Sequence, residues 1–174
     1  TAEAIVRTAM DERSIARLLA AEEKRFHAIY GEADPAMKFT LHPAHAAGRV
    51  IGAEEQRALI DLLVLLRTGV HAMTHTQTGG VETSANLGVV RMDENEVHVA
   101  FFPRSSVNER LDEIVCEAET LAALTGFSLV VGTASPAWRE NPKSKLRTIM
   151  AEVYAAQNGG TPMKIESIHA GLET

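Results

Sequence analysis

The stretch VETSANLGVVRMDENEVHVAFF, residues 81–102, decides the fold. It contains two strand-like runs, Val81–Val90 and Val97–Phe102, on either side of the short polar run Asp93-Glu94-Asn95. Two strands joined by so short a turn pair with each other in opposite directions. The stretch therefore predicts an antiparallel hairpin.

The residues on both sides of this hairpin extend it into a sheet. Val70–Gln77 alternates moderately well between apolar and polar residues, which predicts a further strand, and Thr78-Gly79-Gly80 predicts a turn. After the hairpin, helical spacing over Asn108–Thr125 predicts a helix that Gly126 ends, followed by a strand over Phe127–Thr133. One face of this helix is apolar: Leu111, Ile114, Val115, Ala118 and Leu121. The predicted fold class is α+β, an antiparallel sheet with helices on one face.

The first 66 residues predict two helices and two short strands. Asp11 is expected to cap a helix that ends at Gly31, and a second helix is expected over Ala53–Leu66. The apolar face of the second helix comprises Leu59, Leu62, Leu63 and Leu66. We expect short strands over residues 2–10 and over Ala36–Leu41.

The C-terminal residues predict a helix followed by a strand, as in an α/β layer. We expect Asn141 to cap the helix, with Pro142 at its first position, and Gly159-Gly160 to end it. Its buried face would consist of Leu146, Ile149, Met150 and Val153. The strand Met163–Ile168 would then lead to His169. Because Pro136, Asn141 and Pro142 interrupt the chain, we expect a domain boundary there, between residues 1–134 and 135–174.

Composition excludes several classes of protein. The 174 residues are 45% apolar, enough for a core, and the net charge of -6 without a basic stripe argues against a nucleic-acid partner. The longest apolar run, residues 58–66, is interrupted by Asp61 and is too short to span a membrane. No secretory signal is visible, and the single Cys116 is expected to be a small core residue. The chain begins at Thr1 rather than methionine, so we expect a fragment of a longer protein.

Among the seven histidines, only His169 is a candidate metal ligand from its context. A strand end fixes the direction of an imidazole, and the small residues after His169 allow a bend, although a capping or core role is the alternative. His71 and His75 would share one face of a strand but lie roughly 13 Å apart, too far for one ion. The others, His27, His42, His45 and His98, are expected to be surface or loop residues.

Three further side chains are candidates for binding. Arg104 follows a strand and could bind a carboxylate in a forked geometry, or form an ordinary surface ion pair with Glu109 or Asp112. Asn86 is polar within an apolar strand and could donate to a ligand oxygen or satisfy a sheet edge. Trp138, the only tryptophan, is expected to be a packing anchor between two lobes. No phosphate-binding glycine loop and no Gly-x-Ser-x-Gly, Cys-x-x-Cys or His-Glu-x-x-His motif is present.

Four strings, taken together and in this order, resemble the C-terminal half of the bacterial aminoacyl-histidine dipeptidases, also called Xaa-His dipeptidases or peptidase D. The strings are residues 81–90 (VETSANLGVV), residues 104–106 (RSS), residues 135–144 (SPAWRENPKS) and residues 168–173 (IHAGLE). The match is clear from about residue 58 to residue 173 and weak before residue 52.

This resemblance implies a catalytic α/β domain with two zinc ions per full-length chain, interrupted by a lid of antiparallel sheet and helices. Residues 1–134 would be lid-like, and residues 135–174 would begin the closing catalytic segment. His169 matches the last zinc ligand of the family, and Asn86 and Arg104 match lid residues that hold the substrate. The resemblance also implies a small dipeptide substrate such as carnosine, a cytoplasmic location and a homodimer formed through the lid.

The sequence departs from the family pattern at the remaining ligands. The early His-x-Asp motif, the bridging aspartate and the Glu-Glu pair have no match here, and one imidazole cannot hold a catalytic zinc. We therefore expect no catalytic residue and no bound zinc in this chain alone, which should be inactive. Two alternatives stay open: a non-catalytic binding or dimerisation module with a lid-like fold, and an aminoacylase or carboxypeptidase of the same clan.

Overall fold

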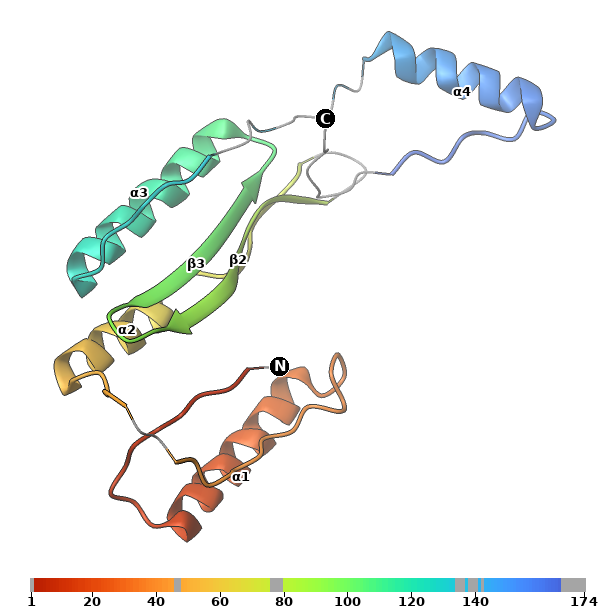
Figure 1. Cartoon of the computed structure of the whole chain (residues 1–174). Helices are drawn as coiled ribbons and strands as arrows, with labels where there is room; N and C mark the ends of the chain where they lie inside the picture. The colour runs from red at the N-terminus through yellow and green to blue at the C-terminus, as the bar shows by residue number, and fades with distance from the viewer. Residues whose placement is uncertain are drawn as a thin grey trace. The chain divides into compact units, whose positions relative to one another are not determined.

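The computed structural model describes residues 2–45, 48–75, 80–133, 137, 141 and 143–166. The elements, in chain order, are α1 (Glu12–Tyr30), α2 (Ala53–Leu65), β1 (Gly69–Met73), β2 (Val81–Met92), β3 (Val97–Ser105), α3 (Asn108–Thr125) and α4 (Lys145–Gln157) (Figure 1). The chain divides into two compact units, Thr1–Val50 and Ile51–Thr174. The boundary expected near residue 135 stays a prediction.

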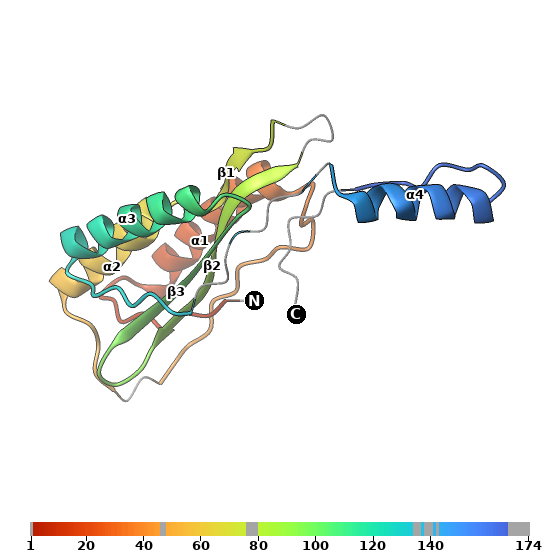
Figure 2. The same ribbon diagram turned by 90° about the horizontal axis from the view of Figure 1, so that it is seen from above.

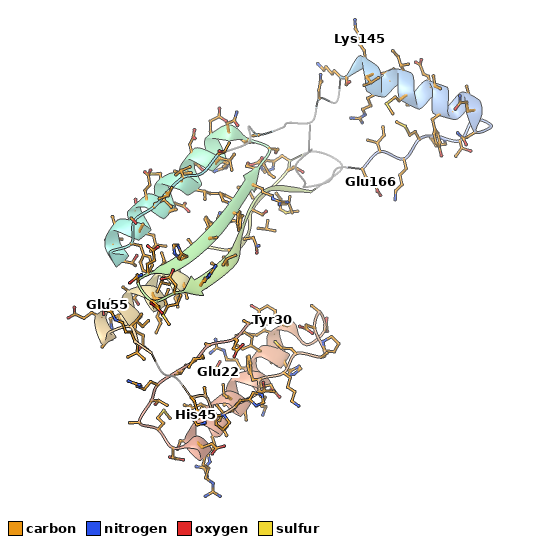
Figure 3. All side chains as sticks on the ribbon, viewed as in Figure 1. Glu22, Tyr30, His45, Glu55, Lys145 and Glu166 are labelled. Carbon is orange, nitrogen blue, oxygen red and sulfur yellow. The ribbon has the colours of Figure 1, made fainter. Side chains whose placement is uncertain are left out.

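The first unit consists of α1 and the segments beside it. The predicted cap is confirmed: the Asp11 carboxylate accepts hydrogen bonds from the Ser14 amide at 3.0 Å and the Ser14 hydroxyl at 2.7 Å. Gly31 ends the helix, as predicted. Glu22 and Tyr30 are labelled on this helix in Figure 3.

The prediction of two short strands in this unit is wrong. Residues 2–10 and 36–41 contain no strand. The backbone amide of Phe39 donates to the Glu23 carboxylate at 2.6 Å, and its ring packs edge-on against Phe26 with centroids 5.5 Å apart. A segment whose contacts go to a helix has no neighbouring strand with which to form a ladder.

The second unit is built on the predicted hairpin. Its sheet has the order β1-β2-β3, and both pairs are antiparallel. The turn is closed by the Asp93 amide, which donates to the Glu96 carbonyl at 3.1 Å. Between β2 and β3 the register is regular except at Gly88, where Leu87 pairs with Phe101 but Val89 pairs with Ala100. One extra residue in β2 therefore forms a bulge.

Helix α3 lies against β3, and α2 lies against α3 (Figure 2). The α+β fold predicted from the sequence is confirmed. Among the described residues, the most buried side chains are Leu62, Thr83, Ala85, Ile114 and Ala122, and they come from α2, α3 and one face of β2. Residues 83 and 85 of β2 are buried whereas residue 86 is exposed, so the two faces of the sheet meet different surroundings.

Helix α3 begins after Val107 and ends as predicted at Gly126, whose φ of 74° lies in the left-handed region that glycine adopts readily. Cys116 is exposed, so the prediction of a core cysteine was wrong. With Leu121 and Leu124, Cys116 lines an apolar hollow of about 290 Å³ on α3.

The region after α3 differs from the prediction in three places. Residues 127–133 form no strand, and Val130 is 86% exposed. Ser144, rather than Asn141, precedes α4; the Asn141 side chain instead accepts from the Lys143 amide at 3.0 Å. Residues 163–166 are not in a strand, and the rest of that predicted strand lies outside the described residues.

The apolar face of α4 is exposed instead of buried: Leu146, Ile149, Met150 and Val153. In the described part of the chain, no helix combines the length and the apolar character needed to cross a membrane.

Candidate functional site

The candidate site is the face of the β2–β3 hairpin that carries Ser84, Asn86, Phe102 and Arg104, called here the open face. Ser84 pairs with Arg104 and Asn86 pairs with Phe102 across the two strands. Directly opposed residues in an antiparallel pair project from the same side of the sheet, and so do residues two apart in one strand. The four side chains consequently line one hollow of about 320 Å³.

Asn86 and Arg104, the two substrate-binding residues predicted from the sequence, are thus diagonal neighbours. Both are exposed. Within the described residues, neither side chain has a hydrogen-bond or ion-pair partner, and Arg104 does not pair with Glu109 or Asp112. A guanidinium with five donors and a carboxamide with two therefore point donors toward solvent from one hollow.

A neighbouring arginine shows the contrasting case. Arg110, in the first turn of α3, lies 2.7 Å from the Glu113 carboxylate and 3.6 Å from that of Glu82 on β2. The hydrogen bond to Glu113, followed by the charges of both carboxylates, raises the pKa of Arg110 above its usual value. Arg110 forms ion pairs with Glu113 and Glu82, whereas Arg104 forms none within the described residues.

Phe102 closes one side of the hollow, which the sequence did not indicate. The Cδ2–Cε2 edge of its ring lies against Gly88: a Cβ atom added to Gly88 would lie 2.4 Å from Cε2 and 2.7 Å from Cδ2 of the ring. Gly88 has an ordinary backbone conformation, so glycine is needed there for space rather than for a positive φ. The ring is nonetheless 51% exposed.

The histidines were assigned correctly in part. His71 sits at a register shift in β1, where its Nε2 lies 3.0 Å from the Arg67 carbonyl and its own carbonyl accepts from Arg67 at 3.2 Å. His98 is a surface residue, as expected, and its Nε2 lies 3.0 Å from Glu96 and 3.5 Å from Asp93. Asp93, Glu96 and His98 lie in or next to the turn between β2 and β3, and closure of that turn brings their side chains together.

The group Asp93, Glu96 and His98 is also the one set of three metal-ligand side chains that lie close together in the described part of the chain. All three are exposed. Asp93 Oδ1 accepts from the amides of Asn95 and Glu96 at 2.9 and 3.0 Å, and these bonds, with His98, hold the pKa of Asp93 below its usual value. A turn stabilised by its own carboxylate accounts for this cluster.

The described residues thus do not supply the ligand set of a dinuclear zinc centre. Asp93, Glu96 and His98, called here the hairpin cluster, are not the ligand set implied by the family resemblance. Their exposed side chains lack the enclosed, ordered surroundings that orient metal ligands. His169 and Trp138 lie outside the described residues. The prediction of His169 as a zinc ligand therefore stays a prediction.

Comparisons with known proteins agree on one class of relative. No family model matches the chain. The cytosol non-specific dipeptidase of Escherichia coli (strain K12) is 33% identical over 121 residues, which cover 70% of this chain and 25% of that protein. The crystal structure of aminoacylhistidine dipeptidase from Vibrio alginolyticus matches with a TM-score of 0.79 and 27% identity, over 92% of this chain and 32% of that one.

The chain thus spans 25% of the length of the curated relative and 32% of the solved structure. The part it spans carries the open face with Asn86 and Arg104. The resemblance predicted from the sequence is confirmed: in both sequence and fold, this chain matches part of a peptidase D-like dipeptidase.

Proposed function

We propose that the chain is the substrate-holding part of a zinc-dependent dipeptidase that hydrolyses Xaa-His dipeptides. The observation that carries the proposal is the cross-strand pairing that brings Asn86 and Arg104 into one hollow with their donors unpaired within the described residues. The names of the two relatives support a dipeptide as the ligand class.

Arg104 is proposed to bind the C-terminal carboxylate of the dipeptide. A planar guanidinium can give two parallel hydrogen bonds to a carboxylate, which fixes the direction of the ligand as well as its position. Because Arg104 has no carboxylate partner within the described residues, no internal ion pair there has to break before the ligand binds.

Asn86 is proposed to donate its amide protons to a carbonyl oxygen of the bound peptide. It lies across the ladder from Phe102 and diagonally from Arg104, so it meets a different part of a ligand held by Arg104. A donor aimed at a peptide carbonyl also suits the oxyanion that forms during hydrolysis.

His169 is the one zinc ligand that we propose for this chain. Zinc would supply a polarised water for hydrolysis, with ligands that must come mainly from outside the described residues. The proposal assigns no step of the reaction to the hairpin cluster. We also propose a cytoplasmic location and a homodimer formed through the lid-like residues 1–134. Sedimentation equilibrium of the chain tests whether it forms a dimer.

Titration of the isotope-labelled chain with Ala-His, followed by NMR, tests the ligand site. We expect amide shifts on the open face, and we expect Ala-His amide, which lacks the carboxylate, to bind much more weakly. Arg104→Gln should weaken Ala-His binding by about tenfold or more, because hydrogen bonds to charged groups are the stronger kind.

Arg91→Gln is the matched control, since Arg91 is an exposed arginine on the paired strand β2 and does not line the hollow. Equal weakening by both substitutions would mean that only general positive charge matters. Unchanged binding in Arg104→Gln would contradict the proposal.

A further inference from the structure

Phe102 is the part of the open face that the proposed function leaves unexplained. Exposed apolar residues are common on this chain, so exposure alone assigns no role. Two features distinguish Phe102: it lines the same hollow as Asn86 and Arg104, and one edge of its ring lies against Gly88.

The bulge makes this arrangement possible. Gly88 is the extra residue of β2 between the Leu87 and Val89 pairs, and its lack of a side chain leaves room for the Cδ2–Cε2 edge of the ring. Because Gly88 meets the ring at this edge, the contact holds the ring in place without covering either of its faces. The ring is 51% exposed, so part of its surface is open to a ligand.

The Phe102 ring lies close to Arg104, the proposed carboxylate-binding residue. Phe102 and Arg104 are two residues apart on β3 and share one side of the sheet, which separates their Cα atoms by about 7 Å. An amino acid whose carboxylate is held by Arg104 would therefore bring its own side chain toward Phe102, with Asn86 on the opposite strand.

We infer that Phe102 determines side-chain specificity, its exposed ring face stacking on the planar imidazole of a C-terminal histidine bound through Arg104. This inference rests on the proposed function and deepens it. Aromatic rings prefer offset or edge contacts with other planar rings, and the gain is beyond that of apolar area alone. An aliphatic side chain would obtain only the area term, so the site would favour histidine over alanine at the same position.

The test compares Ala-His with Ala-Ala, which share the carboxylate and the peptide group, by NMR titration of the chain. We expect the wild-type chain to bind Ala-His about fivefold more tightly than Ala-Ala. Phe102→Leu keeps an apolar wall without a ring and should bring the two affinities together while leaving Ala-Ala binding in place. Gly88→Ala, which displaces the ring, should reduce the preference in the same direction.

Tyr154→Leu is the control variant, because it removes an exposed aromatic side chain that does not line the hollow. An undisturbed amide spectrum in Phe102→Leu shows that the sheet is intact, and a preference for Ala-His that persists in that variant overturns the inference. Equal wild-type affinities for the two peptides overturn the inference alone. Failure of both peptides to bind overturns the proposed function as well.

Discussion

Thr83 Oγ1 on β2 lies 2.8 Å from Ser105 Oγ on β3, and Thr83 is only 1% exposed. Ser105 Oγ also accepts from the Val107 amide at 3.0 Å, at the point where β3 passes into α3. The two hydroxyls therefore join the hairpin to the start of the helix that covers it.

Removing either hydroxyl should destabilise the second unit. Ser105→Ala leaves both the Thr83 hydroxyl and the Val107 amide without their partner, so we expect a loss of about 1–3 kcal/mol in the free energy of unfolding. Thr83→Val should cost less, because Ser105 keeps its bond to Val107. Urea unfolding measures both, with Ser106→Ala as the neighbouring control; an equal loss in all three variants would be inconsistent with this network.

The contact between Gly88 and Phe102 predicts a non-additive pair. Gly88→Ala should destabilise the hairpin by about 1–3 kcal/mol, because the new methyl group overlaps the ring. In a Phe102→Ala background the same substitution should cost little, since the obstacle is gone. A double-mutant cycle by urea unfolding measures the coupling, and additive effects would show that the ring does not rest on Gly88.

The hairpin turn should depend on pH through Asp93. Hydrogen bonds from the amides of Asn95 and Glu96, and then His98, hold the pKa of Asp93 below its usual value. A carboxylate with a depressed folded-state pKa stabilises the fold above its unfolded pKa, and this contribution is lost as pH falls through the lower folded value.

Amide proton shifts of Asn95 and Glu96 should therefore titrate with a midpoint below the usual pKa of an aspartate side chain. Asp93→Asn keeps an acceptor oxygen but removes the charge, and should abolish this transition. A midpoint at or above that value in the wild-type chain would refute the assignment.

The C-terminal part should exchange its amides faster than the sheet. Leu146, Ile149 and Val153 form an exposed apolar face on α4, and residues 163–166 pair with no strand within the described part of the chain. Few buried contacts mean a low free energy for local opening. Hydrogen exchange should show weak protection of Ile165 and strong protection over Val97–Phe102; comparable protection would contradict the prediction.

The sequence predicted those elements that are specified locally. The cap at Asp11, the end of α3 at Gly126 and the turn at residues 93–95 each depend on neighbouring residues, and all three were confirmed. The strands predicted at residues 36–41 and 127–133 failed, because a strand exists only with a partner and apolar composition does not identify one.

The site was predictable only in part for the same reason. Asn86 and Arg104 could be singled out by residue type, but their placement in one hollow depends on the register between two strands. Phe102 was not singled out, because its contact with Gly88 depends on a bulge, and a bulge changes register without a unique sequence signal.

The bulge at Gly88 determines which residues of β2 lie on the open face. On the turn-proximal side of this glycine, odd-numbered residues of β2 share the face that even-numbered residues occupy on the other side, as the pairs Asn86–Phe102 and Val89–Ala100 show. Deleting Gly88 would remove the bulge. Either the residues before it or the residues after it would then have to project from the opposite face of the sheet. The placement of Asn86, Phe102 and Arg104 on one face therefore depends on the number of residues in β2 as well as on their side chains.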